Sequence, residues 1–143
     1  MRFVCDAAGG KAWFRIETEV EAARESELMD HAVEKHFRRA HEQASQAYKP
    51  SPGPFVEQDI GRAAHVRRTM PVFLTLRDGE GNALATAMLP QRHAGRDVPA
   101  IDPVVVGPAN SDPFPEHGEA IRTLGEHFRL TLDRARCYPY RRT

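Results

Sequence analysis

The chain has 143 residues, of which 41% are hydrophobic, so it is long enough for one domain whose core needs no metal or disulfide. Twenty basic side chains balance twenty acidic ones, and net charge therefore gives no argument for a nucleic-acid, membrane or acidic partner. No apolar stretch approaches the length of a membrane span, and the first ten residues lack the apolar segment of a secretory signal. We therefore expect a soluble cytoplasmic protein with reduced cysteines. Cys5 and Cys137 lie near opposite chain ends, which can meet in space, so a disulfide stays open.

Two short strands, "RFVC" and "KAWFRIE", are predicted first, with "DAAGG" between them. Alternation in the second strand places Trp13 on one face and Phe14 and Ile16 on the other. The segment "CDAAGGK" has the cysteine-to-base spacing of a thiol phosphatase loop. Its basic residue, however, is Lys11 rather than a bidentate arginine, and a strand rather than a helix follows. We interpret the segment as a glycine turn.

A long amphipathic helix is predicted over residues 19–48. Thr18 is the expected N-cap, and Glu21 completes the spacing of a capping box. The positive end of the helix dipole explains the acidic residues in the first turns better than cation binding does. The helix is expected to end before "KPSPGP", because its prolines cannot continue it.

Three histidines, His31, His36 and His41, recur at steps of five residues along this helix. Each step turns the side chain by about 140°, so the three imidazoles cannot converge on one ion. We therefore predict no metal site and no cofactor, and we place His31 and His41 in solvent. His36 falls within the apolar face, where a buried imidazole needs hydrogen-bond partners, so we predict it between the helix and the sheet.

Residues 55–69 fit either a short helix or an irregular strand. Residues 71–89 predict a β-hairpin, since two alternating apolar runs flank "DGEGN". This turn begins like a calcium loop, but Ala83 and Leu89 occupy the positions that need a glycine and a bidentate glutamate. The acidic residues of the turn are therefore interpreted as turn formers.

Residues 90–116 contain six prolines and predict a long loop in which "VVV" forms a short strand. The loop is expected to form one wall of a pocket. Its Arg92, His93 and Arg96 suit closure over an anionic small molecule, although a polar loop without a ligand has the same composition. A last amphipathic helix is predicted over residues 116–136. The tail "RARCYPYRR" suits contact with nucleic acid or is a solvated terminus.

These elements predict a single α+β domain over residues 1–143. A small antiparallel sheet of four or five short strands carries two amphipathic helices packed on one face. Three functions stay open. We favour a non-enzymatic binding or interaction domain that self-associates. The alternatives are an enzyme or anion-binding protein whose dispersed site uses His36, His93 and loop arginines, and an accessory contact to nucleic acid through the tail.

The predicted self-association follows from the second strand. Large side chains project from both of its faces, and helices on one face of the sheet cannot cover them all. We expect a two-fold homodimer that buries Trp13 or Phe14 at its interface.

Overall fold

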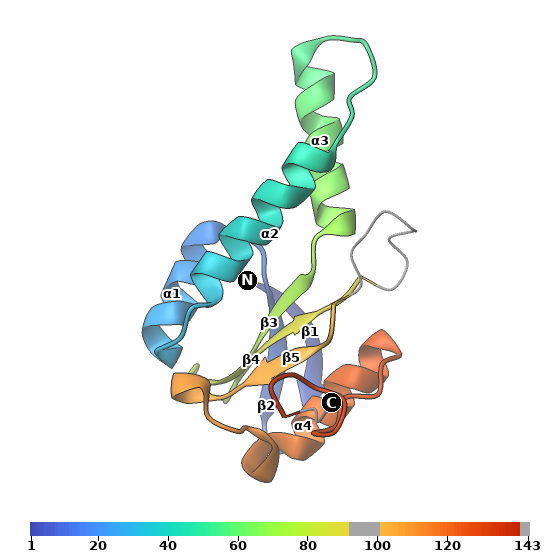
Figure 1. Ribbon diagram of the computed structural model, residues 1–143. Coiled ribbons are helices and arrows are strands. Elements are labelled where there is room, and N and C mark those ends of the chain that lie inside the picture. Colours follow the sequence, from blue (N-terminus) through green and yellow to red (C-terminus); the bar gives the residue numbers. More distant parts are fainter. Residues whose placement is uncertain (92–100, 141–143) are drawn as a thin grey trace.

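The computed structural model describes residues 1–91 and 101–140, and it confirms a small α+β fold. Five strands form one antiparallel sheet in the order β1-β2-β3-β4-β5 (Figure 1). Three helices are inserted between β2 and β3, which nevertheless pair directly. In chain order the elements are β1 (Arg2–Ala7), β2 (Lys11–Ile16), α1 (Glu19–Met29), α2 (Val33–Ala47), α3 (Phe55–Thr69), β3 (Val72–Arg77), β4 (Ala83–Leu89), β5 (Val104–Val106), the short 3-10 helix η1 (Pro108–Asn110) and α4 (Phe114–Phe128).

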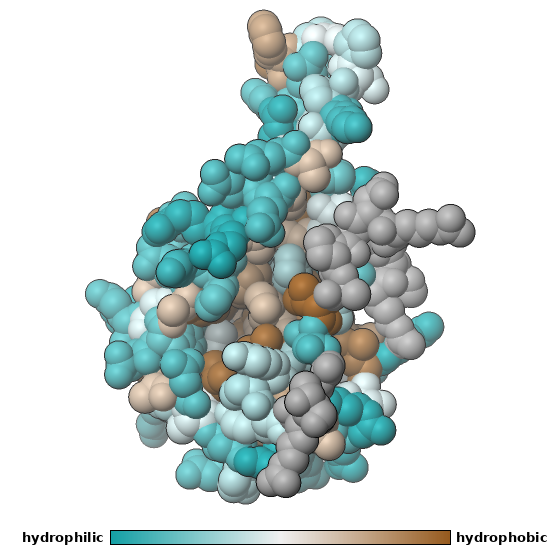
Figure 2. Space-filling view, viewed as in Figure 1, coloured by the Kyte–Doolittle hydropathy of each residue, from teal (hydrophilic) through white to brown (hydrophobic). Residues whose placement is uncertain are grey.

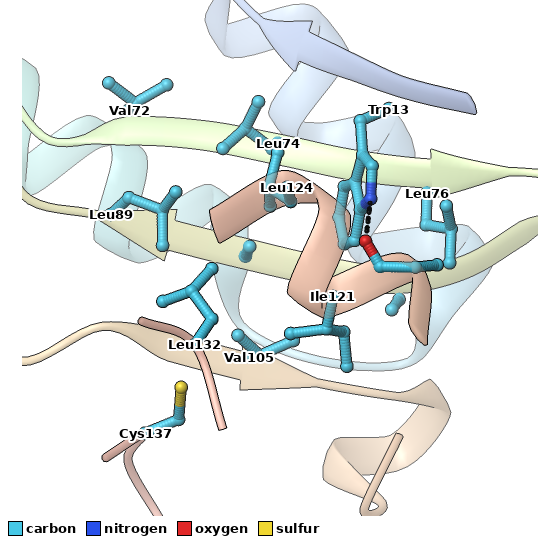
Figure 3. Packing of buried hydrophobic residues seen from close by; sticks show 13 residues of the cluster. Trp13, Val72, Leu74, Leu76, Leu89, Val105, Ile121, Leu124, Leu132 and Cys137 are labelled. Carbon is cyan, nitrogen blue, oxygen red and sulfur yellow. Dashed lines mark hydrogen bonds between the residues drawn. The ribbon is translucent and has the colours of Figure 1, made fainter. Parts of the chain in front are cut away.

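Helices cover both faces of the sheet, whereas the sequence predicted helices on one face only. On one face α4 packs over a core that includes Trp13, whose indole nitrogen donates a hydrogen bond to the Ala120 carbonyl at 2.9 Å (Figure 3). On the other face α1 and α2 cover a second core that includes Ile16 and Phe73. Side chains alternate along each strand, so apolar residues at consecutive positions require cover on both faces.

Because helices cover both faces of the sheet, uncovered faces no longer argue for a dimer at the first hairpin. Trp13 is completely buried within its own chain, so its predicted place at a dimer interface is wrong. Phe14 is half-buried and packs edge-on against Phe3, with 6.0 Å between the ring centroids. The homodimer, and the alternative in which Phe14 lies at its interface, stay predictions.

The two hairpin turns have the backbone that their residues favour, and the order of the strands places the two cysteines far apart. Gly9 and Gly10 adopt positive φ in the first turn. In the second turn the Asp78 carboxylate accepts hydrogen bonds from the Asn82 side chain and from the backbone amides of Asn82 and Glu80, which together lower its pKa. Cys5 lies in β1 and Cys137 lies beside β5, at opposite edges of the sheet. Four strand spacings separate these edges by roughly 19 Å, too far for a disulfide. Both cysteines are free thiols, and burial raises the pKa of Cys137 to about 11.

The predicted helix over residues 19–48 is two helices, α1 and α2, with a break around Asp30. Asp30 has left-handed backbone angles (φ 52°, ψ 55°) and ends α1, while α2 begins after Ala32. The Ser26 hydroxyl accepts a hydrogen bond from the Glu34 amide at 2.9 Å, and this contact satisfies one free amide of the new helix. The Thr18 capping box predicted at the start of α1 is confirmed.

This break reverses the predicted roles of two histidines. His31, expected in solvent, is half-buried, and its Nε2 lies 2.8 Å from the Thr86 hydroxyl. His36, expected in the core, is exposed. His31 lies in the break between the helices, where a helical count does not apply. In α2 the buried face is the expected one, with Val33 and Phe37, but His36 stands at its edge rather than within it.

Residues 55–69, left ambiguous by the sequence, form α3, which pairs with α2 in a hairpin that projects beyond the sheet (Figure 1). The Tyr48 ring packs across Gly61, with its centroid 5.4 Å from that of His65 and 5.5 Å from the Arg62 guanidinium carbon. A Cβ atom on Gly61 would overlap the Tyr48 hydroxyl. Gly61 therefore permits the close approach that joins the two helices.

We predict that Gly61→Ala fails to give the usual helix-stabilising gain. Gly118 in α4 has open space around its missing side chain, so Gly118→Ala is the matched control and should stabilise by about 0.5–1 kcal/mol. Gly61→Ala should lower the free energy of urea unfolding, because Tyr48 must move. In a Tyr48→Ala background the same change should become stabilising. An equal gain from both glycine variants in the wild-type background would contradict this packing.

Candidate functional site

A pocket of about 500 Å³ lies between the α1–α2 junction and strands β4 and β5. Figure 2 shows apolar side chains gathered in a hollow between the hydrophilic surface of α1 and α2 and the carboxyl-terminal segment. Most of the lining is apolar, and the polar side chains come from five residues. The apolar lining residues are Ala32, Val33, Phe73, Ala87, Met88, Val104, Val106 and Pro139, and the polar ones are His31, His36, Thr86, Asn110 and Tyr138.

The short strand β5 and the chain end build the far wall of this pocket. Val104 and Val106 line the pocket, while Val105 between them is buried in the core beneath α4. The carboxyl-terminal segment lies along β5, because the Tyr138 amide donates to the Pro103 carbonyl at 2.8 Å and the Val105 amide to the Tyr138 carbonyl at 3.4 Å. This contact positions Tyr138 at the pocket.

A buried carboxylate fixes the near wall. Glu25 of α1 is fully buried, and one of its oxygens lies 2.7 Å from the Arg77 guanidinium. The Thr86 hydroxyl donates to the other oxygen at 2.5 Å. A buried charge is stable only with such partners, so α1 must sit against β3 and β4 in this one position.

His31 continues this chain of hydrogen bonds into the pocket. The Thr86 hydroxyl uses its only hydrogen in the hydrogen bond to Glu25. Nε2 of His31 is therefore the donor in the hydrogen bond to the Thr86 oxygen. Nδ1 of His31 then accepts from the Val33 amide at 3.4 Å. Burial lowers the pKa of His31 despite the nearby Glu25 charge, so the ring is neutral at neutral pH. Both ring nitrogens are therefore engaged, and His31 acts as a fixed wall of the pocket.

The rim of the pocket carries hydrogen-bonding side chains of a different kind. His36, Asn110 and Tyr138 are exposed and line the opening. Within residues 1–91 and 101–140, none of these three side chains hydrogen-bonds to another residue, so their donors are available to a ligand. The pocket thus combines an apolar floor with a polar rim.

The structure brings only part of the predicted site together. His36 lies at the pocket, although on the rim rather than in the core, and the stretch 90–116 supplies a wall as expected. Arg92, His93 and Arg96 lie outside the described residues. The sequence missed Glu25, which was grouped with the acidic residues of the helix start. The signal was its position three residues after Ala22 and four before Met29, which are the other two buried residues of α1.

Arg134 and Arg136, the two arginines of the tail that the structure describes, form ion pairs within the chain. Arg134 pairs with Asp112 at 2.7 Å and lies over the Tyr140 ring. Arg136 pairs with Asp133. Through residue 140 the segment is therefore packed against the domain, and the prediction of a frayed terminus is wrong for this part.

Comparisons with known proteins give no assignment. No protein-family model matches the chain, no curated protein is significantly similar to it, and the same holds for solved structures. Among the described residues, no group of three His, Cys, Asp or Glu side chains is placed to hold a metal ion. No helix in the described ranges has the length and apolar character to cross a membrane.

We predict that Thr86→Val destabilises the protein more than Thr86→Ser does. Valine keeps the shape of threonine but removes the hydroxyl, which leaves a Glu25 oxygen and the His31 donor without a partner. The expected loss is about 1–3 kcal/mol for such buried groups, whereas serine keeps the hydroxyl and loses one methyl group, about 0.8 kcal/mol. Chemical denaturation of both variants provides the measurement. A valine variant more stable than the serine variant would show that packing alone fixes α1.

Proposed function

We propose that this protein binds a small, mainly apolar molecule that carries one hydrogen-bond acceptor, and that it does not transform this molecule. The observation that carries the proposal is the pocket of about 500 Å³, with its apolar floor and its rim of three available donors. This volume lies within the usual range for small-molecule sites, and so does the combination of apolar walls with few polar groups.

Binding is favoured over catalysis by the state of the reactive groups. The Thr86 hydroxyl is almost completely buried and donates to Glu25, so it is not an exposed nucleophile. Glu25 is paired with Arg77, and both nitrogens of His31 are engaged. A general base needs a free lone pair within reach of a substrate proton, and none of these three groups offers one. The exposed His36 ring is free, but within the described residues no side chain hydrogen-bonds to it and orients it as a base.

The polar end of the ligand is proposed to be a carbonyl or carboxylate. The three rim side chains can all donate hydrogen bonds. Ala32 and Val33, at the start of α2, also line the pocket, and the partial positive charge of a helix start favours an acceptor there. A carboxylate ligand would also fit the alternative, stated in the sequence analysis, that the protein binds an anionic small molecule.

Binding of 8-anilinonaphthalene-1-sulfonate to the folded full-length chain tests the proposal, because this probe combines apolar rings with an anionic acceptor. We expect saturable fluorescence enhancement at one site. Ala32 is exposed at the pocket opening, so Ala32→Trp should fill the entrance and weaken binding at least tenfold, about 1.4 kcal/mol. Loss of one rim donor in His36→Ala or Tyr138→Phe should weaken it about two- to tenfold.

The matched control is Ala8→Trp, which places the same side chain on an exposed residue of the β1–β2 turn. This variant should bind the probe like the wild type. All variants should unfold at similar temperatures, which separates a blocked pocket from a loosened core. Equal binding by Ala32→Trp and the wild type would contradict the proposed site.

A further inference from the structure

The outward face of α3 is apolar and lies beyond the sheet. Val56 is 69% exposed and Ile60 is 66% exposed, and the four-residue spacing places both on one side of the helix. Ala63 and Ala64 continue the stripe one turn later and are also exposed. The opposite side of α3 contacts the end of α2 through Gly61 and His65, which pack against Tyr48. This stripe of Val56, Ile60, Ala63 and Ala64 is called the α3 stripe below.

Charges along α3 are divided between its two ends. Glu57 and Asp59 lie in the first turns, whereas Arg67 and Arg68 lie in the last turn. Asp59 pairs with Arg62 within the chain at 3.6 Å. Among the described residues, Glu57 and Arg67 form no ion pair through their side chains. A helix with an acidic first half and a basic second half complements a copy of itself that runs in the opposite direction.

We propose that two copies of this chain pair through the α3 stripe, with the two α3 helices antiparallel about a two-fold axis. The helix covers residues 55–69, so its midpoint is residue 62. Full overlap then places Ile60 of one copy against Ala64 of the other, and Glu57 against Arg67. Ile60 then meets a smaller side chain, Glu57 meets a base, and Val56 lies opposite Arg68.

The extent of the surface sets the expected strength of this dimer. Fifteen helical residues extend over about 22 Å, and one helix per copy buries less than the roughly 800 Å² per partner of a standard interface. We therefore expect a dissociation constant in the micromolar range. Arg67 lies about 20° around the helix from Val56, so it is in line with the stripe at its carboxyl-terminal end. Its pairing with Glu57 of the other copy fixes direction and register more than affinity. This surface is distinct from the ligand pocket, so either proposal can fail alone.

Sedimentation equilibrium of the full chain, from low to high micromolar concentration, tests the pairing. We expect a reversible monomer–dimer equilibrium for the wild type. Ile60→Glu should weaken it at least tenfold, because it buries charge in the stripe. Val20→Glu is the matched control, since Val20 is an equally exposed apolar residue on α1, and this variant should dimerise like the wild type.

Charge reversal tests the register. Glu57→Arg and Arg67→Glu should each weaken the dimer, and the double variant should restore it, because both antiparallel pairs are then remade with opposite sign. A wild-type chain that stays monomeric across the range overturns the proposal, whatever other partner the face binds. Undiminished dimerisation of Ile60→Glu overturns it as well, and failure of the double variant to recover overturns the antiparallel register.

Discussion

The buried Glu25 carboxylate is the contact on which the rest of the site depends. It receives hydrogen bonds from Arg77 of β3 and Thr86 of β4, so it joins α1 to two strands that are distant in sequence. A buried carboxylate is stable only where hydrogen-bond donors replace the water that it has lost. The contacts of Glu25 therefore fix the position of α1 on the sheet more strictly than apolar packing would. The α1–α2 break follows directly, because α1 must end at Asp30 for His31 to reach Thr86.

The position of α1 also explains the pocket. The chain turns sharply after α1, and α2 then runs outward to form the hairpin with α3 (Figure 1). The face of β4 and β5 nearest the α1–α2 junction is left partly open, and Val104, Val106 and Met88 become pocket walls instead of core. On the opposite face α4 covers the same strands and buries Val105 (Figure 3). Strands β4 and β5 thus have a closed core on one face and an open pocket on the other.

Local patterns predicted much of the fold because they act over short distances. Both hairpins, the Thr18 capping box and the strand at "VVV" depend on a few adjacent residues, and all are confirmed. The break at Asp30 was missed because Ser26 and His31 stabilise it through contacts that no periodicity shows. The sequence did not predict helices on both faces of the sheet, because this depends on which face α4 packs against, and local patterns do not show that. Of the pocket lining, the sequence singled out His36, but it placed this residue in the core rather than at the rim. It missed Glu25, whose pairing with Arg77 spans 52 residues.

The hollow over β4 and β5 is proposed as a binding site for a small molecule. The most direct measurement is the set of nuclear Overhauser effects between the aromatic protons of bound 8-anilinonaphthalene-1-sulfonate and the methyl groups of the protein. We expect contacts to Met88, Val104 and Val106, since these side chains line the pocket. Contacts to Val56 and Ile60 in their place, or contacts to no methyl group of the pocket, would contradict it.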